Sequence, residues 1–527
     1  GEYMETVFLI LLIILFLVAF ALTANFNMHM FQLNSYKPNV QMKWLSQNKG
    51  RLIPSLLLII IAGISLISNS IAGFILSALT MIISALVNKP NKKAKKPLVY
   101  TNRVKRMFVT LGVLALITII GACMIKDKTC SFALLDLVCA FTPMVLLLAN
   151  MINKPVEQGI NNGFINEAKD MLKNAPNLTV IGVTGSYGKT SVKFYLNTLL
   201  KAKYSVLMTP ESFNTPLGVV RTVRESLKAT HEIFICEMGA KNVGDIKEIC
   251  DIVHPKHGII TSVGPQHLES FKTLDNVKKT KFELADALGS DGMLFLNGDD
   301  KNIADYSKNY TYPKPAISYG IDDDSEYSAY DLKLSEKGTN FKVRIKNSDE
   351  TEEFTTKLIG RHNVLNIVGA IAVSHKLGIS LKDLKPQVRK LENVPHRLQL
   401  IDRGTTAIID DAYNSNPNGT KVALETLKLF HGMMKIVVTP GMVELGDKQD
   451  EYNFQFGQNM AEVCDFVALV GRKQTQSIYN GLIDKGYPED KIFVADALME
   501  AMGKVNSLDS EGRKKVILLE NDLPDNY

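Results

Sequence analysis

The sequence lacks the closely spaced cysteines that form disulfide frameworks or hold structural zinc. No C-x-x-C pair and no metal-ligand spacing occur among its six cysteines, which are Cys123, Cys130, Cys139, Cys236, Cys250 and Cys464. A small disulfide-rich fold and a zinc ribbon both require such spacings, so both are excluded. We therefore expect six reduced thiols, most of them buried.

Acidic residues are scarce in the first part of the chain. Residues 1–155 contain 15 Lys and Arg against 4 Asp and Glu, whereas residues 156–527 contain 45 against 50. The net charge of +6 is therefore +11 in the first part and −5 in the rest. The basic residues lie between apolar runs, where they orient membrane helices. Nucleic-acid binding is not predicted, although the chain is basic overall.

Long apolar runs are frequent in the first 150 residues, and each is close to the roughly 20 residues that cross a bilayer. They cover residues 6–24, 52–68, 70–87, 108–125 and 131–149. The loops 25–51 and 88–107 are rich in Lys and Arg, so the positive-inside rule makes both cytoplasmic. We predict a multi-pass cell-membrane domain of about five helices over 1–150. Everything after residue 150 then lies in the cytoplasm, beginning with a linker over 151–177.

After the linker, short apolar strands alternate with helical stretches, which is typical of α/β folds with a largely parallel sheet. A polar stretch at 320–357 has alternating apolar residues and predicts a small antiparallel excursion. Residues 391–397, which include Pro395, predict a hinge. Because so long a chain exceeds one compact core, we expect two α/β domains, over 178–393 and 394–527.

A phosphate-binding loop is predicted where the first of these strands ends. Residues 178–191 read LTVIGVTGSYGKTS, which is a strand, a glycine turn and a helix start. Backbone N–H groups at such a turn bind phosphates. Lys189 would neutralise the outer phosphates, and the Thr190 hydroxyl would bind Mg²⁺. The remaining loop residues that we expect to contact the nucleotide are Gly185, Ser186, Gly188 and Ser191.

The T-G-x-x-G-K-T form of this loop resembles that of the Mur ligases and their relatives. The resemblance covers roughly residues 175–527 and implies a P-loop central ATPase domain followed by a Rossmann-like C-terminal domain. The segments ICEMGA (235–240) and GPQHLESF (264–271) resemble family segments that bind metal. The resemblance thus implies that Glu237 and His267 are Mg²⁺ ligands.

A lysine that family members carbamylate with CO₂ is matched by Lys281, which follows His267 by 14 residues. Lys279 is the alternative if the register slips by two residues. An ammonium beside two Mg²⁺ ions would be repelled, whereas a carbamate is an anion that can hold one of them. The resemblance therefore implies ATP, two Mg²⁺ ions and a carbamylated lysine as the cofactor set.

Two segments resemble the parts of the family that border the adenine and the catalytic cleft. They read LNGDD (296–300) and GRHNVLN (360–366). The resemblance implies that Asn297, His362 and Asn363 belong to the nucleotide site, although ordinary turn and cap chemistry explains such residues equally well.

The second α/β domain carries three more family-like segments. In PHR (395–397), His396 replaces the usual glycine, and Arg397 would reach the transferring phosphoryl group. The segment DDAYNSNP (410–417) resembles D-D-S-Y-N-A-N-P of the F-type members, which implies cleft roles for Asp411 and Asn414. The segment GMVELG (441–446) strengthens the F-type resemblance.

The resemblance implies an ATP-dependent, ADP-forming ligase. A substrate carboxylate attacks the γ-phosphate to give an acyl phosphate, and an amine then displaces phosphate. F-type members add D-alanyl-D-alanine to a muramoyl tripeptide. The implied partners are thus a muramoyl-peptide-like carboxylate donor and an amino-acid or dipeptide acceptor in peptidoglycan synthesis.

The sequence differs from the F-type members in two respects, and these differences leave both the donor and the acceptor substrate open. Membrane helices occupy the place of the family's uridine-nucleotide-binding domain, so a lipid-linked or polyglutamate-type substrate is an alternative. Residues 518–527 read LLENDLPDNY where F-type enzymes usually have K-G-S-R, so the acceptor is also open. A competing class is a membrane ATPase coupled to transport or signalling, which would need the phosphate loop but not His267, Lys281 and Asp411.

Overall fold

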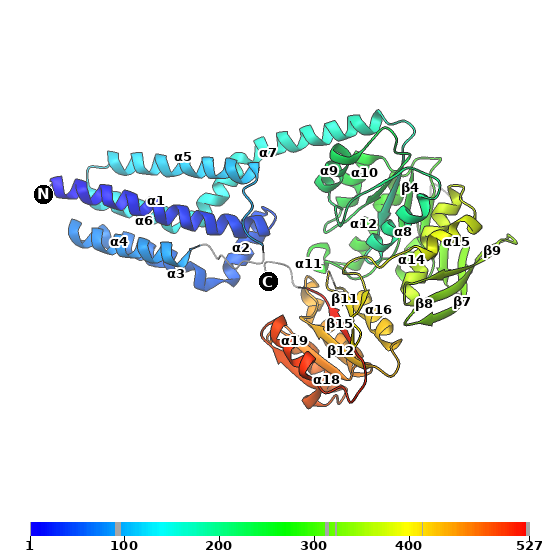
Figure 1. The fold of residues 1–527 in the computed structure, drawn as a ribbon. Helices are drawn as coiled ribbons and strands as arrows, with labels where there is room; N and C mark the ends of the chain where they lie inside the picture. Colours follow the sequence, from blue (N-terminus) through cyan, green and yellow to red (C-terminus); the bar gives the residue numbers. More distant parts are fainter. Residues whose placement is uncertain (1, 90–95, 311–315, 322–323, 414, 523–527) are drawn as a thin grey trace. The chain divides into compact units, whose positions relative to one another are not determined.

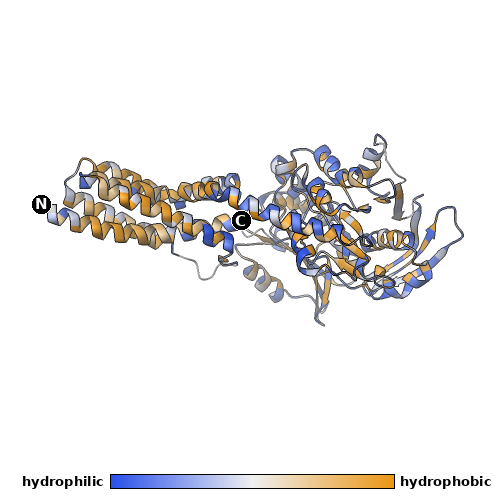
Figure 2. Cartoon of the chain, turned by 90° about the horizontal axis from the view of Figure 1, so that it is seen from above, coloured by the Kyte–Doolittle hydropathy of each residue, from blue (hydrophilic) through white to orange (hydrophobic). Residues whose placement is uncertain are grey.

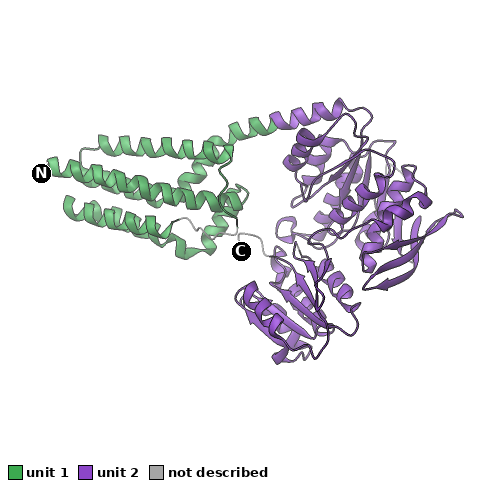
Figure 3. Ribbon diagram, viewed as in Figure 1, with its two compact units in different colours: residues 1–162, 524–527 green, residues 163–523 purple. Residues whose placement is uncertain are grey.

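The computed structural model describes residues 2–89, 96–310, 316–321, 324–413 and 415–522. They form two compact units, with the division between Asn162 and Gly163 (Figure 3). The first unit is helical, and the second contains two β-sheets with helices packed on them (Figure 1).

The first unit is a bundle of apolar helices (Figure 2). Its elements are α1 (Glu2–Leu33), α2 (Pro38–Gln47), α3 (Ile53–Ser65), α4 (Ser70–Val87), α5 (Asn102–Met124), α6 (Lys128–Ala140) and the first part of α7 (Thr142–Lys173). Side chains that accept a backbone N–H cap three of these helices: Asn69 for α4, Thr101 for α5 and Asp127 for α6. Such caps satisfy N–H groups that have no partner within the helix.

Among the described residues, three helices are long and apolar enough to cross a membrane, or up to five if each of two bent pairs is one span. The α2 to α3 pair bends by 96° and the α6 to α7 pair by 71°. Three of the predicted runs thus correspond to α1, α4 and α5. The run 52–68 lies mainly in α3, beyond the first bend, and the run 131–149 spans the break between α6 and α7. The predicted linker over 151–177 is mostly the second half of α7, which ends at Lys173.

The first sheet of the second unit has nine strands in the order β2-β3-β1-β4-β5-β6-β7-β8-β9. The strands are β1 (Thr179–Thr184), β2 (Val206–Met208), β3 (Ile233–Glu237), β4 (His257–Ile260), β5 (Leu294–Asn297), β6 (Ala316–Ile321), β7 (Tyr327–Ser335), β8 (Gly338–Ile345) and β9 (Thr351–Thr356). All pairs from β2 to β7 are parallel, and β7, β8 and β9 form an antiparallel meander. The antiparallel excursion expected over 320–357 is therefore confirmed.

Helices cover both faces of this sheet. Alternate side chains of a strand point to opposite faces, so Ile181 and Val183 of β1 join one core and Val180 joins the other. The first core is covered by α8 (Lys189–Leu200), α14 (Arg361–Lys376) and α15 (Leu381–Arg389). The second is covered by α9 (Pro216–Ser226), α10 (Asp245–Val253) and α12 (Leu274–Ala287).

The second sheet has six strands in the order β10-β11-β15-β12-β13-β14, and only the β10–β11 pair is antiparallel among the described strands. The strands are β10 (Gln399–Asp402), β11 (Thr406–Asp411), β12 (Met434–Thr439), β13 (Phe466–Val470), β14 (Ile492–Ala495) and β15 (Lys515–Glu520). Its helices are α16 (Pro417–Lys428), α17 (Gln449–Ala461), α18 (Gln476–Asp484) and α19 (Leu498–Ser507). The α/β class with a mostly parallel sheet is thus confirmed for both domains.

Candidate active site

The phosphate loop connects β1 to α8, and its glycines are required by close contacts. A Cβ added to Gly185 would lie 2.1 Å from the Thr261 hydroxyl oxygen. A Cβ added to Gly188 would lie 2.7 Å from Asn366 Oδ1, and Gly188 also has a φ of +83°, which favours glycine. The loop is fixed from the β4 side, because Ser262 Oγ accepts the Tyr187 N–H at 2.7 Å.

Lys189 and Thr190 begin α8 directly beyond this loop. Lys189 Nζ donates to the Gly185 carbonyl at 2.6 Å, and burial lowers the pKa of Lys189 to about 8 although Glu237 acts in the opposite direction. Thr190 Oγ1 donates to Glu237 Oε1 at 3.1 Å. β1 and β3 pair in parallel with Val183 opposite Glu237, which places the loop and the carboxylate at the same end of the sheet. A hydroxyl and a carboxylate here fit the oxygen ligands that Mg²⁺ prefers.

Two side chains that the sequence analysis missed also hold Glu237. Lys193 is fully buried, and its Nζ lies 3.0 Å from Glu237 Oε2. Asn214 Nδ2 donates to Glu237 Oε1 at 3.1 Å. Burial raises the pKa of Glu237, but Lys193 and Lys189 outweigh it, so the carboxyl stays below its ordinary pKa. The position of Lys193, one helical turn after Lys189, was the signal that could have revealed it.

Lys281 lies in α12 and is fully buried. Burial and the nearby Lys189 hold the pKa of Lys281 well below its ordinary value. The alternative, Lys279, is exposed to solvent. Burial also lowers the pKa of His267, and Lys281 adds to that shift, so the two side chains lie within electrostatic reach of each other.

The His267 ring is held by a residue of the second α/β domain. Its Nδ1 lies 2.5 Å from Glu444 Oε2, and this hydrogen bond lowers the pKa of Glu444 to about 2. Lys241 Nζ lies 3.1 Å from the other oxygen of the same carboxylate. Among the described residues, no group of three His, Cys, Asp or Glu side chains converges on one point as a metal site. A metal ion here would therefore need further oxygen ligands beyond these side chains.

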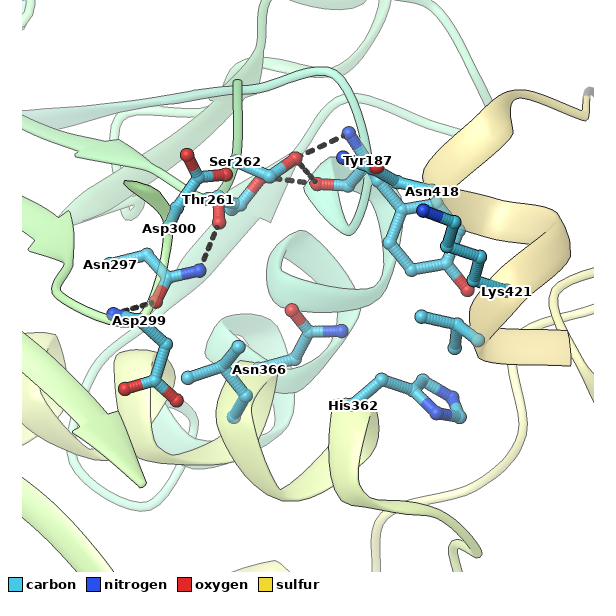
Figure 4. A pocket seen from close by; sticks show the side chains of 12 residues that line it. Tyr187, Thr261, Ser262, Asn297, Asp299, Asp300, His362, Asn366, Asn418 and Lys421 are labelled. Carbon is cyan, nitrogen blue, oxygen red and sulfur yellow. Dashed lines mark hydrogen bonds between the residues drawn. The ribbon is translucent and has the colours of Figure 1, made fainter. Parts of the chain in front are cut away.

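A pocket of about 310 Å³ opens beside the phosphate loop (Figure 4). Asn297 is fixed at its edge, because Nδ2 donates to the Thr261 carbonyl at 2.9 Å. His362 also lines the pocket, and burial lowers its pKa to about 4, so the ring is neutral near pH 7. Asn366 and Lys421, which the sequence analysis did not single out, lie on the same walls.

The Asn363 side chain does not line the pocket. Its Oδ1 accepts from the Tyr195 hydroxyl at 2.6 Å, and its Nδ2 donates to the Ile359 carbonyl at 2.9 Å. Asn366, one turn later on α14, takes the pocket position instead. Asn363 thus fixes the start of α14 from within the core.

The segment that leads into the second domain has a left-handed backbone at His396, a conformation that favours glycine. His396 has a φ of +58°, and its Nδ1 lies 2.8 Å from Asp410 Oδ2. The Arg397 guanidinium stacks over the Tyr413 ring, with 4.2 Å between its central carbon and the ring centroid. Asn414 lies outside the described residues.

Two buried carboxyls meet at the ends of paired strands in the second domain. Asp411 ends β11 and lies opposite Glu520 of β15. Burial raises the pKa of Asp411 to about 7 and that of Glu520 well above its ordinary value, and the Asp411 carboxyl adds to the shift of Glu520. Glu520 Oε1 accepts from the Ser415 hydroxyl at 2.5 Å. The sequence analysis identified Asp411 but not Glu520.

Two family models match the chain. Residues 183–374 match the Mur ligase middle domain, and residues 396–519 match a domain described as Mur ligase, glutamate ligase domain. These matches cover the two α/β domains described above.

Curated relatives are similar over the same region. The UDP-N-acetylmuramoyl-tripeptide–D-alanyl-D-alanine ligase of Bacillus subtilis (strain 168) is 32% identical over 282 residues, which are 53% of this chain and 59% of the relative. The protein of the same name from Buchnera aphidicola is 30% identical over 320 residues, 59% of this chain and 68% of the relative. The chain thus spans about three fifths to two thirds of the length of these relatives.

Solved structures share the fold of the second unit. The MurF ligase from Thermotoga maritima in complex with ADP aligns with a TM-score of 0.61 and 26% identity, over 69% of this chain and 81% of that one. MurF from Acinetobacter baumannii aligns with a TM-score of 0.63 and 24% identity, over 70% and 78%.

Proposed function

This chain belongs to the Mur ligase family, and on that premise we propose that it is an ATP-dependent ligase that joins a carboxylate to an amine through an acyl phosphate. The observation that carries the proposal is the phosphate loop, where Thr190 bonds to Glu237, together with the fully buried Lys281, whose pKa the nearby Lys189 lowers. A simple nucleotide switch would need the phosphate loop but has no use for a buried lysine such as Lys281.

The nucleotide would bind with its base and sugar in the 310 Å³ pocket and its phosphates on the loop. Loop N–H groups and Lys189 would neutralise the phosphate oxygens. Thr190 and Glu237 would hold Mg²⁺, which supplies positive charge at the phosphates. Arg397 lies in the segment predicted to be a hinge, and it would approach the γ-phosphate if the second domain closed over the nucleotide.

Lys281 has the chemistry that carbamylation requires. Only a neutral amine attacks CO₂, and burial next to Lys189 keeps the pKa of Lys281 well below that of a free lysine. The neutral amine nitrogen forms a bond to the CO₂ carbon and loses one proton, which converts the neutral lysine side chain into an anionic carbamate. With His267 and a phosphate oxygen, that carbamate would complete the ligands of a second Mg²⁺ ion.

The first unit is proposed to span the cell membrane. Its outward surface carries large apolar side chains, including Leu56, Ile75 and Val109, each more than half exposed. An apolar surface of this extent is stable only against lipid or another protein. The basic loops favour a cytoplasmic position for the catalytic unit, where ATP is.

The named relatives indicate the substrates. We propose a muramoyl-peptide carboxylate donor and D-alanyl-D-alanine or another short amine acceptor. A lipid-linked form of the donor is the alternative that the membrane unit favours, because such a donor would be presented at the bilayer surface.

The test is ADP release by the full chain in detergent, with each donor, soluble or lipid-linked, paired with D-alanyl-D-alanine and other amines. We expect release to require both a donor and an acceptor. ADP release that is equally fast with neither substrate, and unchanged in Lys281→Ala, would instead establish the membrane ATPase.

A further inference from the structure

Glu444 joins the two α/β domains at the candidate metal site. It lies in the loop after β12 of the second domain, and its carboxylate contacts His267 at 2.5 Å and Lys241 at 3.1 Å, both in the first domain. The Glu444 carbonyl also accepts the Glu269 N–H at 3.3 Å. One residue of the second domain therefore contacts the first through both its side chain and its backbone.

The backbone on both sides of this contact is strained. Glu444 has a φ of +61° and His267 a φ of +49°, in the left-handed region that costs a non-glycine residue free energy. Gly446 approaches the same segment, since a Cβ there would lie 3.5 Å from the Glu269 backbone. Such strain persists only where surrounding contacts impose it, and it is frequent at functional sites.

The contact determines which nitrogen of His267 is available to a ligand. An ionised carboxylate only accepts hydrogen bonds, so Nδ1 carries the proton and donates it to Glu444. The lone pair is then on Nε2. Metal-binding histidines almost always donate their other ring N–H to a carboxylate, carbonyl or water, which fixes the ring and raises its basicity.

We propose that Glu444 is a positioning residue that orients His267 for the second metal ion, so that this metal site is complete only while the second domain is packed on the first. The inference rests on the function proposed above. It explains why a residue 177 positions later in the chain contacts the His267 ring. It also ties metal binding at this site to the contact between the two α/β domains.

The experiment titrates Mn²⁺ into the full chain in detergent, with a non-hydrolysable ATP analogue and bicarbonate, and measures free Mn²⁺ by electron paramagnetic resonance. The wild-type chain should bind two Mn²⁺ ions. Glu444→Gln should weaken one of the two sites by about 10- to 100-fold and leave the other unchanged.

Three further variants separate positioning from a general structural effect. Glu462→Gln is the matched control, because Glu462 lies in the same domain in an exposed pair with Lys485 and should leave both sites unchanged. Lys241→Met removes the other partner of Glu444 and should change binding less than threefold. His267→Ala should weaken the same site, and adding Glu444→Gln to it should cause no further loss, because the two residues act as one unit.

The outcomes distinguish this inference from the proposed function. A wild-type chain that binds two ions, with unchanged affinities in Glu444→Gln, would refute the inference alone. Full additivity of the His267 and Glu444 variants would refute it as well. A wild-type chain that binds fewer than two ions would refute the two-ion site of the proposed function and the inference with it.

Discussion

Lys193→Met is the substitution whose effect on stability follows most directly from the structure. Lys193 and Glu237 form an ion pair of 3.0 Å, and their side chains are 0% and 1% exposed. Asn214 and Thr190 also bond to Glu237, but neither carries a positive charge. Methionine preserves the length and apolar stem of the lysine but removes its charge, together with its contacts to Glu237 and to the Glu211 carbonyl. The Glu237 carboxylate would then be buried with its nearest opposite charge lost.

The magnitude follows from breaking this buried ion pair, which leaves Lys189 as the remaining positive charge that acts on Glu237. Removing one partner of a buried ion pair costs about 3 to 5 kcal/mol, whereas replacing both partners by neutral groups is often nearly neutral. For a domain of this size, each kcal/mol lowers the melting temperature by about 2 to 4 °C. We expect Lys193→Met to melt about 6 to 20 °C lower, and Lys193→Met combined with Glu237→Gln to recover most of that loss.

The assay is thermal unfolding of the full chain in detergent, followed by a maleimide dye that reacts with newly exposed thiols. Cys236 and Cys250 are buried in the same domain, and Cys236 is the residue before Glu237, so their labelling reports the unfolding of this region. Lys201→Met, at the exposed end of α8, is the control and should stay within about 0.5 kcal/mol of the wild type.

Two results would refute this reasoning. A single variant that melts with the wild type would show that the Glu237 carboxylate does not depend on Lys193. A double variant no more stable than the single one would show that the loss came from packing of the lysine stem and not from the unpaired charge.

The remaining predictions concern pH, the phosphate loop and the carbamate. Burial raises the pKa of Asp411 and Glu520, so the folded chain retains protons that the unfolded chain loses, and stability should fall as pH rises above about 4. Asp411→Asn should therefore raise the melting temperature more at pH 8 than at pH 5, and an equal shift at both would contradict this. Gly188→Ala should reduce the affinity for ADP by roughly 10-fold or more, measured by calorimetry, because the new Cβ would lie 2.7 Å from Asn366 and the loop would have to move. Unchanged affinity would show that the loop adapts without losing its phosphate contacts. Lys281→Ala should abolish bicarbonate-dependent ADP release, whereas the exposed Lys279→Ala should retain it, and the opposite pattern would transfer the role to Lys279.

Local sequence patterns predicted much of the fold because their physical basis is local. The alternation of Phe341 and Val343 predicted the antiparallel excursion, and the structure places both in one core. The glycine spacing at 182–188 predicted a tight strand-to-helix turn, which is where β1 passes into α8. In the helical unit, apolar length predicted α1, α4 and α5 but not the bends between α2 and α3 or α6 and α7.

The rest depends on contacts between distant segments, which no local pattern encodes. The sequence analysis assigned Asn363 to the nucleotide pocket, but Asn366 lines it instead. Both residues lie on α14, and only tertiary packing decides which of them faces the pocket. Glu444 was visible as part of a family-like segment, but its contact with His267 depends on how two domains meet. Glu520 became notable only when β15 paired with β11 and placed it beside Asp411.

The edge strand β9 of the nine-stranded sheet affects how readily copies of the protein would aggregate at high local concentration. β9 is an edge strand, and an edge with unpaired backbone groups is a template on which another chain can add a strand. Its sequence, Thr351–Thr356, places two adjacent glutamates there, and Glu352 is bonded to Lys385 of α15 at 2.7 Å. A second copy aligned on this edge would bring like charges together. Edge-to-edge aggregation is thereby discouraged, which would matter most at the membrane location proposed above, where copies are concentrated in two dimensions.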